Sequence, residues 1–281
     1  MPLRAPSRKA VRISPVRASA AESAWFRNQL LSLIYSMHNS VMFWVKAGWR
    51  DTGMAEDLKI TQGGIAMDKS PAGVLQDVMN KLGKQWLKTF DMAAPKIADG
   101  FAKKVLRHTD GSFASALRKS GFSVKFQTTK AVRDALDAET FNNVSLIKSI
   151  PQKYLNDVQG KVMRSITGGR SMKELTSDLE EVYGLTHKRA ALIARDQNNK
   201  ATAVVHKTRQ KEVGINRAVW IHTSASVHPR EEHEAWGDEE KTYDIEQGMW
   251  SEVDQEYVWP GTPINCGCTS MSVVPGMDEE D

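Results

Sequence analysis

The amino-acid sequence predicts an α+β protein that is mainly helical in its N-terminal two-thirds and ends in a small α+β domain. Apolar residues recur every three or four positions over most of the chain before Gly214, which is typical of amphipathic helices. After Gly214 this period is lost, and short β-prone runs alternate with the turn residues Gly237, Gly248 and Gly261. Helices that precede strands, rather than alternate with them, indicate the α+β class.

Length and composition allow a folded protein with a substantial core. The chain has 281 residues, of which 41% are hydrophobic, enough for one large or two ordinary domains. Two cysteines exclude a disulfide framework, so we expect a reducing, intracellular setting. Polar side chains interrupt residues 30–49, and the basic N-terminal segment lacks a long apolar stretch. We therefore expect neither a membrane span nor a signal peptide.

Charge is distributed unevenly along the chain. The formal net charge is only +4, but residues 1–21 contain no acid and five cations: Arg4, Arg8, Lys9, Arg12 and Arg17. Three prolines interrupt the same segment, so we expect residues 1–21 to form a disordered basic arm that contacts double-stranded DNA or an acidic protein surface. A solvated arm without a partner is the alternative. Residues 278–281 form an acidic tail.

Residues 22–140 are expected to form a helical region. The first predicted helix spans residues 22–49, with an apolar stripe at Phe26, Leu30, Leu33, Met37, Val41 and Trp44. This segment is unusually aromatic, and the candidates for docking on a partner protein are Trp25, Phe26, Trp44 and Trp49. Packing of the same side chains in the core is the alternative. A loop is expected over residues 51–70.

Further helices are expected up to residue 169. One begins at Pro71 and continues to Val105 with a break near Pro95, and a short helix follows over residues 111–120. Residues 122–126 alternate like a strand, and helical spacing returns over residues 129–147. Pro151 then opens another helix, which a glycine pair closes.

Two more helices are predicted before Gly214. Ser171 and Glu174 have the spacing of a capping box, so a helix is expected to begin there and to end at Gly184. Thr186 is expected to cap the second one. A polar cluster of Arg195, Asp196 and Asn199 either forms a site or pairs with neighbouring loops. Beyond this helix, strands are predicted over residues 218–221 and 269–274.

The C-terminal region contains donor types that suit zinc. The candidate ligands are His228, His233, Cys266 and Cys268, because imidazoles and thiolates match this ion. Only Gly267 separates the cysteines, so we expect this glycine to permit a tight turn that brings both sulfurs to one point. A structural zinc ion is one interpretation of these residues. Buried thiols that simply pack a turn are the other.

The same residues also permit a catalytic interpretation. A metal-dependent hydrolase or nuclease could use His233 and the Cys266/Cys268 pair, with a nearby acid as base. No glycine-rich phosphate loop or nucleophile elbow accompanies them. We therefore expect that the protein is not an enzyme.

An ordered set of motifs resembles the phage Mu F-like head morphogenesis (minor head) protein family of tailed phages. These motifs are residues 191–197, Lys200, Ala203, Gly214-Ile215, Trp220, Arg230–His233, Trp236-Gly237 and Pro260–Cys268, preceded by Asn143–Pro151 and Tyr154. The resemblance implies a Mu F-like minor head domain with the acidic tail over residues 141–281. Relatives often have an arginine between the final cysteines, where this chain has Gly267, and an acid and an arginine where it has Ser226 and His228.

What the resemblance implies is a structural protein of the virion. Such proteins lie inside the phage head near the portal, contact the portal protein and other head proteins, and assemble in the host cytoplasm. Some relatives are carried with the DNA during ejection. The matched site positions are His233, Cys266 and Cys268, whereas His228 is not an inherited ligand.

Overall fold

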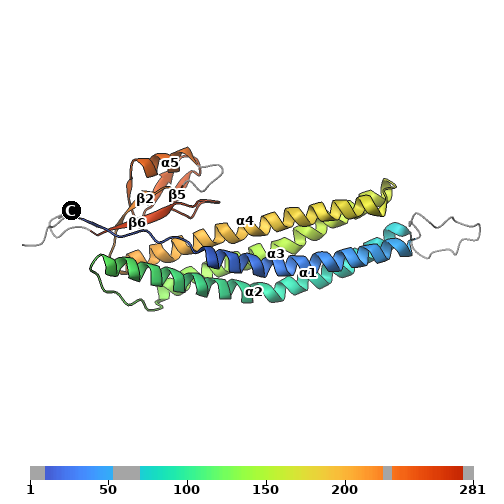
Figure 1. The fold of residues 1–281 in the computed structure, drawn as a ribbon, viewed down its shortest axis with the longest axis horizontal. Coiled ribbons are helices and arrows are strands. Elements are labelled where there is room, and N and C mark those ends of the chain that lie inside the picture. The colour runs from blue at the N-terminus through green and yellow to red at the C-terminus, as the bar shows by residue number, and fades with distance from the viewer. Residues whose placement is uncertain (1–9, 53–69, 224–229, 275–281) are drawn as a thin grey trace, which may run out of the picture. The chain divides into compact units, whose positions relative to one another are not determined.

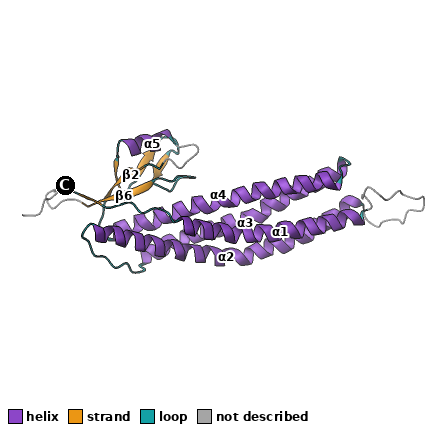
Figure 2. Ribbon diagram, in the orientation of Figure 1, coloured by secondary structure: helices purple, strands orange, loops and turns teal. Residues whose placement is uncertain are grey.

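The structure, a computed structural model, describes residues 10–52, 70–223 and 230–274. It confirms the predicted α+β class, with four long helices before a small, strand-rich C-terminal region (Figures 1 and 2). The helices are α1 (Ala20–Asp51), α2 (Pro71–Lys119), α3 (Lys130–Thr167), α4 (Met172–Glu212) and α5 (Glu231–Asp238). The strands are β1 (Val11–Arg12), β2 (Arg217–Ile221), β3 (Thr242–Asp244), β4 (Met249–Ser251), β5 (Glu256–Val258) and β6 (Thr269–Val274).

The chain divides into two compact units. The first, here called the bundle unit, comprises residues 25–99 and 141–193. The second, the sheet unit, comprises the described parts of residues 1–24, 100–140 and 194–281. No helix in the described ranges is long and apolar enough to cross a membrane.

Parts of α1 to α4 supply the bundle unit with a continuous apolar interior. On α1 the buried positions are Phe26, Leu30, Ile34, Met37, Val41, Val45 and Trp49. Steps of three and four residues keep these side chains on one face of the helix. A buried imidazole, His38, is among the polar groups of this interior; it lies 2.9 Å from the Tyr154 hydroxyl, and its ring stacks on Tyr183.

The docking interpretation of α1 is wrong for two of the four candidate residues. Phe26 and Trp49 are 0% and 1% exposed, so they belong to the core of the bundle unit. The predicted stripe ended at Trp44, but the helix buries Val45 instead and leaves Trp44 51% exposed. Trp25 is half-buried.

Prolines expected to break or begin helices lie inside them instead. Pro95 lies within α2, and Pro151 lies within α3. A proline costs an interior helix one hydrogen bond, about 3 kcal/mol, but burial of apolar residues on both sides of it offsets that cost. Ala94 and Ile97 are buried around Pro95, as are Ile150 and Tyr154 around Pro151.

The predicted start of α4 is confirmed, but its predicted interruption is wrong. The Ser171 hydroxyl accepts from the Glu174 amide at 3.3 Å, and the Glu174 carboxylate accepts from the Ser171 amide at 2.8 Å. This second bond lowers the pKa of Glu174. Gly184 does not end the helix, and the Thr186 hydroxyl donates to Val182 O within it, 2.8 Å away, rather than capping a new one.

The sheet unit contains a four-stranded antiparallel sheet in the order β1-β6-β2-β3, and β4 pairs with β5 beside it. The two predicted strands, β2 and β6, lie at its centre, with Arg217 opposite Val273 and Ile221 opposite Thr269. Residues 122–126 form no strand, because Phe126 stacks on Phe113 of α2, 5.6 Å away, instead of pairing along the backbone.

The expected disordered arm requires a correction for residues 10–21. Val11 and Arg12 form the edge strand β1, opposite Val274 and Val273 of β6. Ile13 and Val16 are 0% and 4% exposed, so they anchor this segment in the core of the sheet unit. Helix α1 begins at Ala20, within the segment predicted to be disordered.

Candidate functional site

The cysteine segment follows a loop that ends where β6 begins. Asn265 has a φ of 59°, and the Cys266 amide donates to Pro263 O at 3.0 Å. The role expected for Gly267 is wrong, because this glycine lacks a positive φ and an added Cβ would meet Thr223 Oγ1 at 3.4 Å, an ordinary contact. Residues two apart in an extended chain project from the same side, so Cys266 and Cys268 converge without a turn between them.

Helix α4 holds this loop through residues of the polar cluster. The Asn265 amide donates to Asp196 Oδ1 at 2.6 Å, and Asn199 Nδ2 donates to Cys266 O at 3.0 Å. The structure therefore supports the interpretation of Asp196 and Asn199 as partners of a neighbouring loop. These contacts also explain why the α4 motif and the cysteine motif occur together.

A second contact lets the loop approach α4 closely. Gly261 has a φ of 87°, and a Cβ there would lie 3.1 Å from the Cβ of Ala203. A larger residue at either position would separate the loop from the helix. The small side chains at these two motif positions therefore have a packing reason.

Three of the four candidate ligands come together. His233 lies on α5 with its Nδ1 atom 3.6 Å from Cys266 Sγ and 4.0 Å from Cys268 Sγ. Ligand atoms of these three residues all lie within 4.8 Å of one another. The exposed fractions of the residues are only 2%, 4% and 6%. His228, the fourth candidate, lies outside the described residues.

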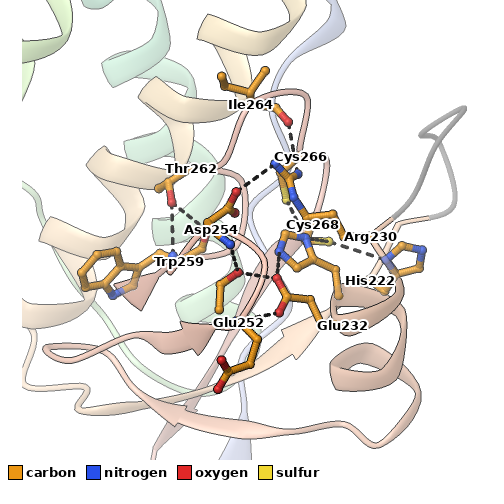
Figure 3. Close-up of polar contacts among 12 residues, drawn as sticks. His222, Arg230, Glu232, Glu252, Asp254, Trp259, Thr262, Ile264, Cys266 and Cys268 are labelled. Carbon is orange, nitrogen blue, oxygen red and sulfur yellow. Dashed lines mark hydrogen bonds and ion pairs between the residues drawn. The ribbon is translucent and has the colours of Figure 1, made fainter. Parts of the chain in front are cut away.

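A second histidine, which the sequence patterns did not indicate, lies at this cluster. His222 Nδ1 lies 3.6 Å from Cys268 Sγ, and the two side chains face each other (Figure 3). Their proximity follows from the register of the sheet. Since Ile221 is opposite Thr269, the next pair in the same register is His222 and Cys268. Only the pairing of β2 with β6, which the sequence does not state, could have identified His222.

Aromatic rings enclose His233. The ring of Trp220 lies edge-on to it at 4.8 Å, and the ring of Trp236 stacks on it at 5.3 Å with an interplanar angle of 25°. Both tryptophans are themselves buried. This surrounding fixes the orientation of the imidazole and excludes water from that part of the cluster.

The interaction between the two cysteine side chains moves their pKa values in opposite directions. The Cys268 thiol donates to the Cys266 sulfur, and this bond, helped by His233, lowers the pKa of Cys266 to about 4 against the opposing effect of burial. The same bond and burial raise the pKa of Cys268. The arrangement therefore favours one thiolate in the buried pair, a form that binds a soft metal ion.

A carboxylate lies on the other side of the His233 ring. Glu232 Oε1 is 3.9 Å from His233 Nε2, while Glu232 itself accepts from the Ser251 hydroxyl and, at 3.1 Å, from the Glu252 amide (Figure 3). Asp254 lies close enough to form a second possible ligand group with Glu232 and His233. One oxygen of Asp254 is also 3.5 Å from Arg230 Nη2, which provides a competing partner.

The remaining predicted site residues lie elsewhere. Arg4, Arg8 and Lys9 are outside the described residues. Arg12 forms an ion pair with Glu240 at 2.7 Å, which reduces its availability to phosphate, and Arg17 is exposed.

The segment that contains the cysteine cluster is similar to a known protein family. The model of the family "Phage Mu protein F like protein" matches residues 156–271, a range that contains all of α4, strand β2, the start of β6, α5 and both cysteines. Over this range the chain is similar to the phage Mu F-like family. The resemblance predicted from the motifs is thereby confirmed over this range.

One relative aligns with nearly all of the chain. An uncharacterized protein of Haemophilus influenzae is 26% identical over 279 residues, which cover 96% of this chain and 57% of that protein. The chain thus spans less than two-thirds of the relative's length. No solved structure matches the chain.

The part of the chain that matches the phage Mu F-like domain also contains the candidate site. Its matched range includes α4, whose Asp196 and Asn199 hold the cysteine loop. It also includes His222, His233 and the tryptophans that enclose His233. The domain therefore coincides with the part of the chain that builds the candidate metal centre.

Proposed function

We propose that this protein is a minor head protein of a tailed phage that acts in head assembly at the portal. The match of residues 156–271 to the phage Mu F-like family carries this proposal. In this role the protein assembles in the host cytoplasm and remains inside the head near the portal. It contacts the portal protein, other head proteins and packaged double-stranded DNA, and it leaves the head with the DNA during ejection.

The burial of the cysteine cluster supports a structural role over the metal-dependent hydrolase. A hydrolase or nuclease acting through His233 needs an open coordination position that a substrate can reach. His233, Cys266 and Cys268 are all at least nine-tenths buried, and two tryptophan rings cover the histidine. A site closed in this way suits stabilisation of the domain.

An exposed aromatic pair on α1 is the element that we assign to portal docking. Phe43 and Trp44 are 62% and 51% exposed, and their rings meet edge-to-face at 5.2 Å. Large exposed aromatic side chains are frequent anchors of protein interfaces. Since Phe26 and Trp49 are buried in the bundle unit, this pair replaces them in the docking proposal.

A contact with DNA is assigned to the cations of the basic N-terminal segment that have no acidic partner among the described residues or lie outside them. Arg12 already has an acidic partner, so the cations that remain from the predicted arm are Arg4, Arg8, Lys9 and Arg17. Their phosphate contacts would add affinity without selecting a sequence.

Deletion of the gene from the phage tests the assembly role. Lysates of the mutant should contain portal protein and major capsid protein but defective heads, and a copy supplied in trans should restore normal heads. The matched control is a trans copy with Trp250→Ser, which changes an exposed aromatic side chain away from the proposed docking pair. Normal, infectious particles from the deletion mutant would contradict the proposal.

A further inference from the structure

We propose that His222, His233, Cys266 and Cys268 form a closed, tetrahedral site for a structural zinc ion. The proposal concerns the fold of the sheet unit and does not depend on the role in the phage head. It assigns as fourth ligand a histidine that lies at the end of β2, in place of His228.

The distances fit an ion placed between the sulfurs and the imidazoles. Zinc lies about 2.3 Å from a thiolate and about 2.05 Å from an imidazole nitrogen, so a tetrahedral site separates sulfur from nitrogen by about 3.6 Å. The separations in the structure are 3.6 Å for Cys266 with His233, 3.6 Å for Cys268 with His222, and 4.0 Å for Cys268 with His233. Each histidine presents its Nδ1 atom to the sulfurs.

The four ligands come from three segments that the fold brings together. The cysteines precede β6, and His222 follows β2 at the position opposite Cys268. His233 lies on α5, where the aromatic rings hold it. The ligand atoms of His233, Cys266 and Cys268 already lie within 4.8 Å of one another, and His222 is not part of that group. His222 is therefore the ligand that must shift toward the ion when the ion binds.

Close packing against α5 places His222 at this position. A Cβ at Gly237 would lie 2.3 Å from the His222 Cβ and 2.9 Å from the His222 backbone nitrogen. Such contacts do not occur in real structures, so any other residue at 237 must push His222 away from α5. Gly237 lies one helical turn after His233, and the same helix therefore sets the positions of both histidines.

The surroundings of His233 are those of a metal-bound imidazole. With Nδ1 bound to the ion, Nε2 must carry the proton and needs an acceptor. Nε2 is buried and has no hydrogen-bond partner in the described residues, but Glu232 Oε1 lies 3.9 Å away. A carboxylate behind a ligating histidine is the usual outer partner in zinc sites. Ser251 and the Glu252 amide hold Glu232 there.

The types and number of donor atoms indicate which ion binds and whether its role is structural or catalytic. Two sulfurs and two nitrogens in a tetrahedron suit zinc, whereas magnesium and calcium prefer oxygen ligands. Four protein ligands leave no position for a substrate, which is the arrangement of structural zinc sites. The ion would join β2, α5 and β6, so its binding would be coupled to the folding of the sheet unit.

Metal analysis of the full chain tests the proposal directly. The protein is expressed in medium with zinc, desalted in the presence of a weak chelator, and analysed for metals. We expect about one tightly bound zinc per chain and two thiols that react with a thiol reagent only after a strong chelator is added. Absence of zinc, or iron in its place, would overturn the proposal.

Two histidine variants identify the fourth ligand. His222→Ala should weaken zinc binding in a competition titration by more than about 100-fold, beyond the 10- to 100-fold loss that we expect for Glu232→Gln as an outer partner. His228→Ala is the matched control and should bind zinc like the unchanged protein. Wild-type affinity in His222→Ala, or loss of zinc in His228→Ala, would contradict the assignment.

Cobalt spectroscopy keeps the test valid if a variant folds poorly. Co²⁺ in the wild-type site should show the intense visible bands of tetrahedral coordination and near-ultraviolet thiolate charge transfer. In Gly237→Ala, where all four ligands remain but His222 is displaced, the visible bands should weaken while thiolate charge transfer persists. An unchanged spectrum in this variant, or six-coordinate bands in the wild type, would count against the site.

Discussion

Arg209 of α4 makes a two-point ion pair with Asp110 of α2 inside the sheet unit. Its Nε and Nη2 atoms donate to the two Asp110 oxygens, both at 2.7 Å, while Nη1 donates to Glu212 at 2.6 Å and to Gln127 O at 2.8 Å. The arginine is 1% exposed, so its charge depends on these partners. Loss of the arginine leaves two partly buried carboxylates, Asp110 and Glu212, without their cationic partner.

Replacement of Arg209 should destabilise the protein strongly. For Arg209→Met we expect the free energy of unfolding to fall by about 2 to 4 kcal/mol, because Asp110 and Glu212, which are only 23% and 21% exposed, lose their cationic partner. Lys130→Met is the control, since it removes the exposed Lys130–Asp134 pair and should cost less than about 1 kcal/mol. Urea denaturation measures both. Equal effects of the two substitutions would show that the Arg209 group contributes little.

Burial of His206 should make stability depend on pH. Desolvation lowers the pKa of His206 to about 3, and its ring lies edge-on to Phe113 at 4.6 Å. The unfolded chain takes up this proton near pH 6.5 and the folded chain only near pH 3, so stability is lost as pH falls between these values. From pH 7 to pH 5 the loss should be about 2 kcal/mol.

A comparison with His206→Leu isolates this effect from the titration of carboxylates. The difference in free energy of unfolding between the wild-type protein and His206→Leu should change by about 2 kcal/mol from pH 7 to pH 5. The stability of His206→Leu should depend less on pH than that of the wild type. A constant difference between pH 7 and pH 5 would mean that His206 takes up its proton at the same pH in the folded and the unfolded protein, so that its pKa is not lowered by folding.

The exposed pair on α1 should mediate portal association. Phe43→Ser combined with Trp44→Ser should weaken binding to purified portal protein by about 30-fold, the equivalent of about 2 kcal/mol. Because both side chains are exposed, the melting temperature should change little. Trp250→Ser, which alters a tryptophan that is 43% exposed in β4, should bind normally. Undiminished binding of the double variant would place the contact elsewhere.

The basic segment should bind duplex DNA with a defined salt dependence. Four cations that neutralise phosphates give a slope of log affinity against log salt of about −3.6. Removal of residues 1–9 should reduce the slope to about −0.9, whereas Arg12→Gln should change it little because Arg12 pairs with Glu240. A slope that stays the same after removal of residues 1–9 would reject the assignment.

Local patterns in the sequence were sufficient for part of this fold. The change of period after Gly214 marks the start of the strands, and the capping box of Ser171 and Glu174 marks the start of α4. Local sequence patterns did not predict the lengths of the helices. Pro95, Pro151 and Gly184 are helix breakers locally, and only tertiary burial of their neighbours keeps the helices continuous.

Local sequence patterns also predicted only part of the candidate site. His233, Cys266 and Cys268 were predicted from their donor types, and the fold brings them together. His222 became visible only through the pairing of β2 with β6, which connects residues 46 positions apart. Likewise, Trp44 lies one position from the buried Val45, and a helical stripe read from sequence does not resolve that difference.

Quantitative mass spectrometry of purified phage heads tests the central claim most directly. The ratio of this protein to the portal protein and the major capsid protein is measured in virions before DNA ejection and in emptied particles afterwards. We expect the protein in full heads at a copy number comparable with that of the portal protein, far below that of the capsid protein, and reduced after ejection. Its absence from full heads, while it remains abundant in the lysate that produced them, would contradict a role as a minor head protein.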